Sequence, residues 1–170
     1  MREQAKKIYL EFLSGKSAAF PELVRLLTPR FYRMFRHLGA DQYEAEDCCQ
    51  DFFLAIFRSG GSYDRTRDFL PWAYMIARHL YFRSREASKI KIIPIFESLQ
   101  AAEVQRDDTG ICELLALLSE EKRAVFELKH FQDLKFQEIA EVLEIPVGTV
   151  KSRMFAAVSE LGEIMKRRET

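Results

Sequence analysis

The segment from Ser62 to Arg85 interleaves cationic and aromatic side chains, a combination suited to binding unpaired nucleic acid. Aromatic faces stack on unpaired bases, and arginine side chains follow the phosphate backbone. The interleaved set is Tyr63, Arg65, Arg67, Phe69, Trp72, Tyr74, Arg78, His79, Tyr81, Phe82, Arg83 and Arg85. Phe69 and Trp72 also fall on an apolar stripe at helical spacing, so we expect most of the rings to serve the core. The segment therefore predicts a surface for a separated strand.

A second motif, residues 136–150, has the arrangement of a helix-turn-helix. Two crossed helices need apolar contacts, a small residue where they approach most closely, and a preset entry to the second helix. The residues that meet these needs are Ile139, Ala140, Leu143, Ile145, Pro146 and Val150. Short hydroxyls and two cations follow, where recognition helices meet bases and phosphates. An ordinary helical hairpin is the alternative.

Glu144 occupies the turn position that such motifs commonly fill with glycine. A left-handed backbone at a residue with a side chain costs roughly 1 kcal/mol. Packing between the two helices can absorb a cost of that size.

A polar row on a predicted helix points to a protein partner. Asp47, Gln50 and Asp51 are spaced i, i+3 and i+4, opposite an apolar stripe, so they share one face. An acidic face suits a basic partner helix. The alternative is a solvated acidic face placed favourably near a helix N-terminus.

The residues that usually carry catalysis or metals are scattered. The three histidines form no metal-ligand spacing with the three cysteines, and no glycine-rich phosphate loop occurs. We expect no enzyme, no metal and no cofactor. Cys48, Cys49 and Cys112 do not make a disulfide framework, so reduced thiols are expected, and a redox role for the adjacent pair stays open.

The elements that must position these motifs are helices. Only 7 Gly and 5 Pro interrupt stretches rich in Ala, Leu, Glu, Lys, Arg and Phe, which predicts an all-α protein. Three apolar stripes at steps of three or four should pack together. They comprise Phe20, Leu23, Leu27, Phe31, Met34 and Leu38; Ala45, Cys49, Phe52, Phe53, Ile56 and Phe57; and Phe69, Trp72, Ala73, Ile76, Ala77 and Leu80.

Helical periodicity fails from about Ser88 and resumes at Cys112. We therefore expect two small helical domains, residues 1–88 and 111–170, joined by a linker over residues 89–110. The apolar run Ile90 to Phe96 would dock and pack the two domains together. About 22 linker residues reach about 70 Å when extended, close to two turns of duplex.

Net charge is zero, with 26 basic and 26 acidic residues, so any polyanion must meet local patches. Residues 1–88 carry a net charge of +3, whereas residues 113–170 carry −2. No apolar run approaches the roughly 20 residues needed to span a bilayer, and no signal-peptide core is present. We expect a cytoplasmic protein without membrane insertion.

Three segments in order resemble the extracytoplasmic-function group of bacterial sigma factors, the dissociable promoter-recognition subunits of RNA polymerase. Residues 45–54 are similar to that family's region two polymerase-binding helix, and residues 69–79 to its promoter-melting segment. Residues 146–153 resemble the start of its region four recognition helix. With Ala19 and Phe20, the resemblance covers nearly the whole chain outside the linker. It implies a sigma region 2 helical bundle followed by a sigma region 4 helix-turn-helix.

The resemblance also implies three sets of site residues. The polymerase-binding set is Asp47, Gln50, Asp51 and Leu54. The set for the minus ten element is Arg65, Thr66, Arg67, Phe69, Trp72, Arg78, His79 and Arg83. The set for the minus thirty-five element is Lys129, Thr149, Lys151, Ser152, Arg153 and Phe155.

The implied function is transcription initiation: binding core RNA polymerase, reading the minus thirty-five box and melting the minus ten box. The implied partners are the coiled coil of the largest polymerase subunit, the polymerase flap, promoter DNA and an anti-sigma factor. Two features depart from the family, namely His79 where Asn is frequent and the cation-poor turn from Ala156 to Glu160. The alternatives are a sigma-like decoy that binds an anti-sigma protein without productive DNA binding, or a stand-alone helix-turn-helix regulator.

Overall fold

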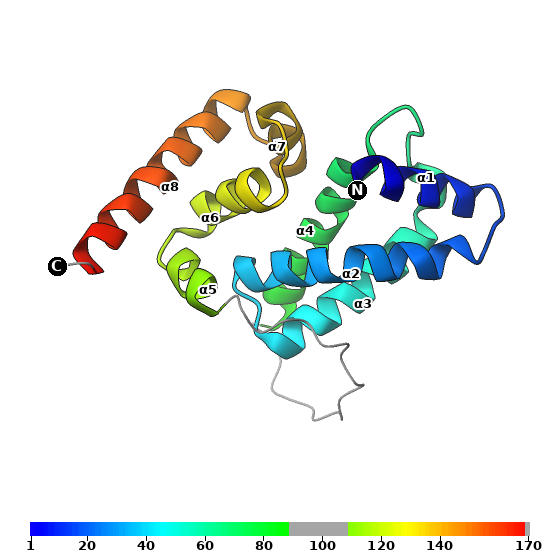
Figure 1. Cartoon of the computed structure of the whole chain (residues 1–170), viewed down its shortest axis with the longest axis horizontal. Helices are drawn as coiled ribbons and strands as arrows, with labels where there is room; N and C mark the ends of the chain where they lie inside the picture. Colours follow the sequence, from blue (N-terminus) through cyan, green and yellow to red (C-terminus); the bar gives the residue numbers. More distant parts are fainter. Residues whose placement is uncertain (89–108, 169–170) are drawn as a thin grey trace.

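The computed structural model describes residues 1–88 and 109–168, and all regular structure in these two ranges is helical (Figure 1). The N-terminal bundle contains α1 (Arg2–Leu13), α2 (Ala19–Leu38), α3 (Gln42–Arg58), the short 3₁₀ turn η1 (Gly60–Ser62) and α4 (Phe69–Ser88). The C-terminal bundle contains α5 (Thr109–Ala116), α6 (Glu120–Phe126), α7 (Phe136–Leu143) and α8 (Val147–Arg168). The all-α prediction is confirmed.

The start of α3 is fixed by its own sequence. The Asp41 side chain accepts a hydrogen bond from the Glu44 amide at 2.8 Å, and the Glu44 carboxylate accepts one from the Asp41 amide at 2.9 Å. This capping box satisfies two backbone donors that a helix start leaves open. It sets the rotation of α3, so that Ala45, Cys49 and Phe52 face the core.

An aromatic cluster joins α1, α4 and the loop before α4. The Tyr9 ring lies 4.6 Å from Phe69 and 5.6 Å from Trp72, and the Tyr63 ring lies 4.9 Å from Trp72, measured between centroids. The Tyr9 hydroxyl donates to the Ile56 carbonyl at 3.0 Å, so α3 is tied in as well. Such ring pairs add about 0.5–1.5 kcal/mol each beyond simple burial. The cluster fixes the position of α4.

The helix-turn-helix consists of α7 and α8, as the sequence predicts. Ile139, Leu143 and Val150 are buried between the two helices, and Ala140 is buried beside them. Glu144 adopts the left-handed conformation with φ 55° and ψ 41°, and the next amide, that of Ile145, donates to the Ala140 carbonyl at 3.1 Å. The turn is thus closed by a helix C-cap in which the glycine position holds a glutamate.

The two bundles share a continuous hydrophobic core. Helix α7 packs on α4, while α5, α6 and the π-helical turn η2 (Glu127–Phe131) pack on α2 (Figure 1). Gly39, at the end of α2, has φ 106°, and a Cβ there would lie 2.8 Å from the Arg123 guanidinium. The absence of a side chain at Gly39 therefore permits the closest approach of α6 to α2.

The apolar stripes are largely confirmed, with one exception and one addition. Phe57 is exposed rather than buried, because it lies at the rim of the bundle against Phe12 and Phe20. On α4, Tyr74 and Tyr81 are buried in addition to Phe69 and Ala73, since this helix is covered both by its own bundle and by α7. The expected docking of Ile90 to Phe96 lies outside the described residues.

The strained turn predicts a stabilising substitution. Glu144→Gly should raise the free energy of unfolding by up to about 1 kcal/mol, because glycine adopts the left-handed conformation without a Cβ clash. The contact between Glu144 and the His79 ring, which this substitution removes, is exposed and contributes little. Urea unfolding followed by circular dichroism measures the change. The matched control, Glu141→Gly in the interior of α7, should instead lower it by about 1 kcal/mol; a loss of stability in both variants would contradict the assignment of strain to Glu144.

Candidate functional site

The proposed polymerase-binding residues lie together on one open face of α3. Asp47, Gln50, Asp51 and Leu54 are all exposed, and Leu54 keeps 51% of its surface accessible. Tyr43, one turn earlier, is 68% exposed. The side chains of Leu54 and Tyr43 are not buried in the core. The surface therefore combines carboxylates with large apolar side chains, as a protein interface does. Tyr43 is not among the predicted residues, although its i, i+4 spacing from Asp47 is visible in the sequence.

The residues proposed for the minus ten element are split by the structure into exposed and covered groups. Arg65, Thr66 and Arg67 lie exposed in the loop before α4, and His79 and Arg83 are exposed on α4. Phe69 is only 1% exposed and is part of the aromatic cluster with Tyr9, so it offers no surface to DNA here. Trp72 and Arg78 are half-buried.

Local hydrogen bonds shape the loop before α4. The Asp64 carboxylate accepts from the Thr66 hydroxyl at 2.7 Å and from the Thr66 amide at 2.9 Å, and these bonds hold the pKa of Asp64 below its usual value. The Tyr63 hydroxyl donates to the Arg67 carbonyl at 2.7 Å. The loop is therefore a preformed turn that presents Arg65 and Arg67 to solvent.

The first turns of α8 present most of the residues proposed for the minus thirty-five element. Lys151, Ser152 and Phe155 are exposed, with Phe155 at 79%. Arg153 is half-buried and pairs with Glu121 at 2.8 Å. Lys129 is turned inward, because its ammonium donates to the Leu134 carbonyl at 3.2 Å and lies over the Phe136 ring. Thr149 is half-buried, and its carbonyl accepts from the Ser152 hydroxyl at 3.0 Å.

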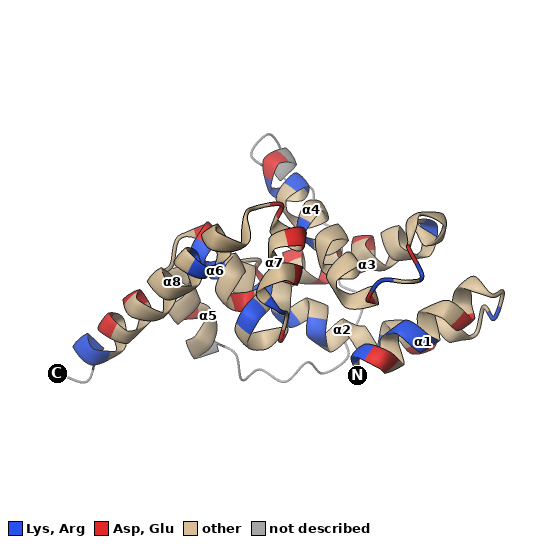
Figure 2. Ribbon diagram, turned by 90° about the horizontal axis from the view of Figure 1, so that it is seen from above, with Lys and Arg blue, Asp and Glu red and all other residues tan. Residues whose placement is uncertain are grey.

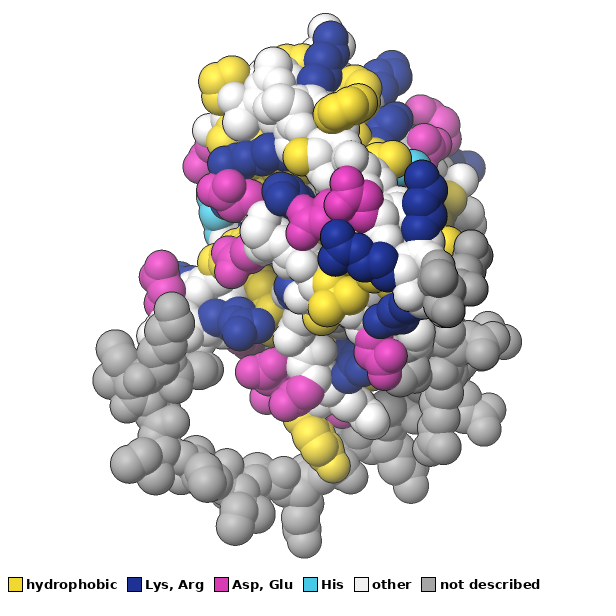
Figure 3. Space-filling model, turned by 90° about the vertical axis from the view of Figure 1, so that its left-hand side faces the viewer, with side chains coloured by type: hydrophobic (Ala, Val, Ile, Leu, Met, Phe, Trp, Pro, Cys, Tyr) yellow, Lys and Arg dark blue, Asp and Glu magenta, His cyan; other side chains and the backbone are white. Residues whose placement is uncertain are grey.

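The charge on the C-terminal bundle is mixed. Figure 3 shows basic and acidic side chains interspersed on the side of the molecule that carries α5 and α8. Three cations of this bundle are paired with acids: Lys122 with Glu160 at 2.5 Å, Arg153 with Glu121 at 2.8 Å, and Arg167 with Glu163 at 3.9 Å. Fewer unpaired cations mean fewer phosphate contacts and a weaker dependence of DNA binding on salt.

Three acidic residues of α7 and of the turn after it contact side chains of the N-terminal bundle, and Figure 2 shows the acidic residues of α7 in red. The Arg2 guanidinium donates two hydrogen bonds to the Glu138 carboxylate, both at 2.9 Å. Two more exposed contacts join the bundles: Arg67 pairs with Glu141 at 3.6 Å, and the His79 ring lies 3.8 Å from the Glu144 carboxylate. The partners of α7 and its C-cap thus include Arg67 and His79, both proposed to contact the minus ten element.

A buried chain of polar groups also crosses between the bundles. His37 Nδ1 lies 2.5 Å from Glu127 Oε2, and Glu127 Oε1 accepts from the Gln132 amide at 2.6 Å. The Gln132 side-chain oxygen accepts from the Tyr74 hydroxyl, which in turn accepts from Arg30 Nε. Arg30 Nη2 also donates to the Gln132 carbonyl at 2.7 Å. Burial raises the pKa of Tyr74, so its hydroxyl remains a donor.

The cysteine pair lacks the surroundings of a redox centre. Burial raises the pKa of Cys48 to about 11 and that of Cys49 to about 12. Because the thiolate is the reactive species, both thiols should be inert at neutral pH. Across residues 1–88 and 109–168, no group of three His, Cys, Asp or Glu side chains could hold a metal ion.

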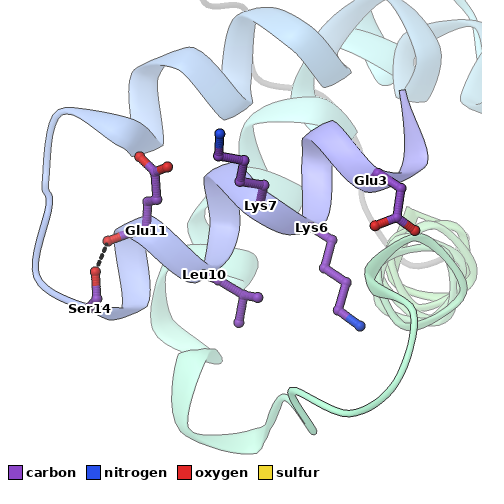
Figure 4. A pocket seen from close by; sticks show the side chains of 6 residues that line it. All are labelled: Glu3, Lys6, Lys7, Leu10, Glu11 and Ser14. Atoms are coloured by element: carbon purple, nitrogen blue, oxygen red, sulfur yellow. Dashed lines mark hydrogen bonds between the residues drawn. The ribbon is translucent and has the colours of Figure 1, made fainter.

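One hollow lies along α1, lined by Glu3, Lys6, Lys7, Leu10, Glu11 and Ser14 (Figure 4). All six side chains come from the same helix or its end, and the Ser14 hydroxyl donates to the Glu11 carbonyl at 2.7 Å. Acidic and basic groups are mixed, and no second element converges on them. The hollow therefore has no arrangement suited to chemistry.

Comparison with protein families gives two matches, one in each bundle. Residues 23–88 match the family described as Sigma-70 region 2, and residues 111–161 match Sigma-70, region 4. None of the helices described above is both long and apolar enough to cross a membrane.

Full-length relatives and solved structures agree with these matches. The chain is 27% identical to the ECF RNA polymerase sigma factor SigW of Bacillus subtilis, with 91% of this chain and 92% of the relative covered. It is 29% identical to the ECF RNA polymerase sigma factor RpoE of Cereibacter sphaeroides, with 87% of each covered. Two solved structures share the fold at 22% identity. They are CnrH in complex with the cytosolic domain of CnrY (TM-score 0.74; 96% and 98% covered) and RpoE with the anti-sigma factor NepR from Bartonella quintana (TM-score 0.69; 86% and 96% covered).

The raised thiol pKa values predict low reactivity in the folded chain. In a Cys112→Ser background, a disulfide reagent at pH 8 should modify neither Cys48 nor Cys49 until denaturant unfolds the protein, whereupon both react. Absorbance of the released thiolate counts the modified groups. Rapid reaction of either cysteine in the native chain would show that burial does not suppress its ionisation.

The Arg2–Glu138 contact predicts an acid-dependent loss of stability. Burial alone would raise the pKa of Glu138, but the hydrogen bonds from Arg2 and from the Lys135 amide outweigh it and hold the pKa below the ordinary value. A carboxyl with a lowered folded pKa stabilises the fold above its unfolded pKa of about 4.3, and that stability is lost as the pH falls through the folded value.

Glu138→Gln should therefore destabilise the protein by about 1 kcal/mol at pH 7, and the difference from wild type should shrink toward zero as the pH falls from about 5 to 3. Urea unfolding at each pH gives the two curves. The matched control, Glu113→Gln at an exposed site, should show no such convergence. A constant difference for Glu138→Gln at all pH values would contradict the charged contact.

Proposed function

The chain belongs to the extracytoplasmic-function group of sigma factors, which direct core RNA polymerase to promoters, and we propose that it does so through three separate surfaces. The observation that carries the assignment of surfaces is the exposed row Asp47, Gln50, Asp51 and Leu54 on α3. This row contributes nothing to the core and meets a basic coiled coil of the largest polymerase subunit. Tyr43 extends the same surface by one turn.

The start of α8 reads the minus thirty-five box. Lys151, Ser152 and Phe155 project from the second helix of the helix-turn-helix, where side chains enter the major groove. The exposed ring of Phe155 suits an apolar contact with a thymine methyl group. Arg153 joins them once it exchanges Glu121 for a phosphate, and Lys129 adds a backbone contact.

The loop before α4 and the exposed side of α4 capture the opened minus ten box. Arg65 and Arg67 follow the phosphates, Thr66 stands beside them, and Trp72 supplies a half-buried ring for stacking. His79 and Arg83 extend the track along the helix. Phe69 supports this surface from the core, where it holds Trp72 in place.

Residues 1–88 act as sigma region 2, residues 111–170 as sigma region 4, and residues 89–110 as the linker between them. The chain supplies recognition and strand capture but no catalysis, which belongs to the polymerase. The polymerase flap receives region 4. An anti-sigma factor is a further partner, supported by the structural likeness to sigma factors solved with such proteins. The protein acts in the cytoplasm, where polymerase and promoter DNA meet.

Run-off transcription with purified bacterial core polymerase and a pool of randomised promoters tests the proposal. The wild-type chain should enrich templates that share two boxes. Asp47→Ala with Asp51→Ala should lower core binding and product at least tenfold, because the charged part of the interface is removed. Sequencing of the enriched templates gives the two boxes.

The matched control is Glu3→Ala with Glu22→Ala, which removes the same charge from exposed positions outside α3 and should transcribe as wild type. Core binding without any promoter-specific product would favour the decoy. DNA binding without core binding would favour a stand-alone regulator.

A further inference from the structure

The loop before α4 lies beside α1 and is tied to the N-terminal bundle through the side chain of Tyr63 (Figure 1). The buried ring belongs to the aromatic cluster, with its centroid 5.4 Å from that of Tyr9 and 4.9 Å from that of Trp72. The hydroxyl group points out of the cluster and donates to the Arg67 carbonyl at 2.7 Å. One side chain therefore contacts both the ring proposed to stack on the strand and the turn that carries the cations.

The turn itself is closed by bonds among its own residues. The Arg67 amide donates to the Asp64 carbonyl at 3.0 Å, and the Asp64 carboxylate accepts from the amide and the hydroxyl of Thr66. This is the β-turn in which an aspartate at the first position fixes the third residue. The bonds keep Arg65 and Arg67 exposed, but they all lie within residues 64–67. They set the shape of the turn and not its place on the bundle.

Two further contacts of this region with other elements are ion pairs at the surface. Arg2 lies 3.6 Å from Asp68, and Arg67 lies 3.6 Å from Glu141. Solvent-exposed pairs of this kind are weak and are screened by salt. Burial, by contrast, raises the pKa of the Tyr63 hydroxyl to about 12, so this group remains a donor at neutral pH. Of the three contacts, the hydrogen bond from Tyr63 is the one that salt and pH disturb least.

We propose that Tyr63 is a positioning residue for strand capture, which fixes the distance between the Trp72 ring and the two arginines of the turn. The inference rests on the proposed function of this loop and of α4, and Tyr63 itself does not touch the strand. Rings stack on bases while arginines follow the phosphates, so both must match the distance from base to backbone in one strand. A turn held in place before the strand arrives also loses less conformational freedom on binding.

The substitution Tyr63→Phe keeps the ring in the cluster and removes only the bond to the turn. The Arg67 carbonyl belongs to an exposed residue, so water replaces the lost donor and the variant should fold. Tyr9→Phe is the matched control, because its ring lies in the same cluster and its hydroxyl donates to the Ile56 carbonyl on α3 instead of the turn. Circular dichroism compares the folding of both variants with that of the wild type.

Digestion of the full chain with trypsin reports the state of the turn in the absence of any strand. Trypsin cleaves after arginine, and a turn released from the bundle opens locally more often. In Tyr63→Phe, cleavage after Arg65 and Arg67 should be about threefold faster than in the wild type. Tyr9→Phe should be cleaved there at the wild-type rate. Mass spectrometry of the fragments identifies the two sites.

Anisotropy of a labelled single strand of random sequence, measured over a series of salt concentrations, reports capture. Each phosphate contact contributes about 0.7 to the slope of log affinity against log salt for a single strand. Tyr63→Phe should bind about fivefold more weakly at low salt and lose about 0.7 from the slope, because one arginine of the turn no longer reaches its phosphate. Partial unfolding would lower the affinity equally at every salt concentration, so the change in slope identifies positioning.

A wild-type slope in Tyr63→Phe would overturn the positioning role, and so would an equal loss of slope in Tyr9→Phe. Unchanged cleavage after Arg65 and Arg67 would show that Tyr63 does not hold the turn. A wild-type chain that does not bind the strand would overturn the proposed function of this loop, and the cleavage rates would still decide whether Tyr63 holds the turn. The two proposals fail separately.

Discussion

The hydroxyl group of Tyr74 lies where the two bundles meet, and the packing of one bundle on the other places a buried polar group there that must be satisfied. It donates to Gln132 and accepts from Arg30, so one phenol bonds to a group of each bundle. A hydrogen bond of this kind adds little net free energy to stability, but a buried donor or acceptor left without a partner destabilises the fold. The contact therefore joins the two bundles at a buried point, whereas the contacts of Glu141 and Glu144 around it are exposed.

The same packing explains why neighbouring helices of one bundle have such different surfaces. Helix α3 buries its apolar side in the N-terminal core and leaves the opposite side exposed. Helix α4 has fewer exposed positions, among them His79 and Arg83, because its own bundle covers one part and α7 another. An aromatic-rich helix can meet both demands, since tyrosine buries a ring and still offers a polar end to a neighbouring element.

Local sequence patterns predict the helices and the turn between α7 and α8. Leu23, Leu27 and Phe31 recur at helical spacing, and Glu144 was recognised as a residue in a glycine position, because both signals lie within a few adjacent turns. The burial of Tyr74 was not predictable in this way. Its partner Gln132 lies 58 residues away in the sequence. The spacing of apolar residues within one segment does not indicate which distant segment will pack against it.

The uneven coverage of the two helices has a consequence for sequence change. A substitution at an exposed position of α3, such as Asp47 or Asp51, leaves the packing of both bundles unchanged. A substitution at Tyr74 on α4 alters contacts in both bundles at once, because its hydroxyl bonds to Arg30 and to Gln132.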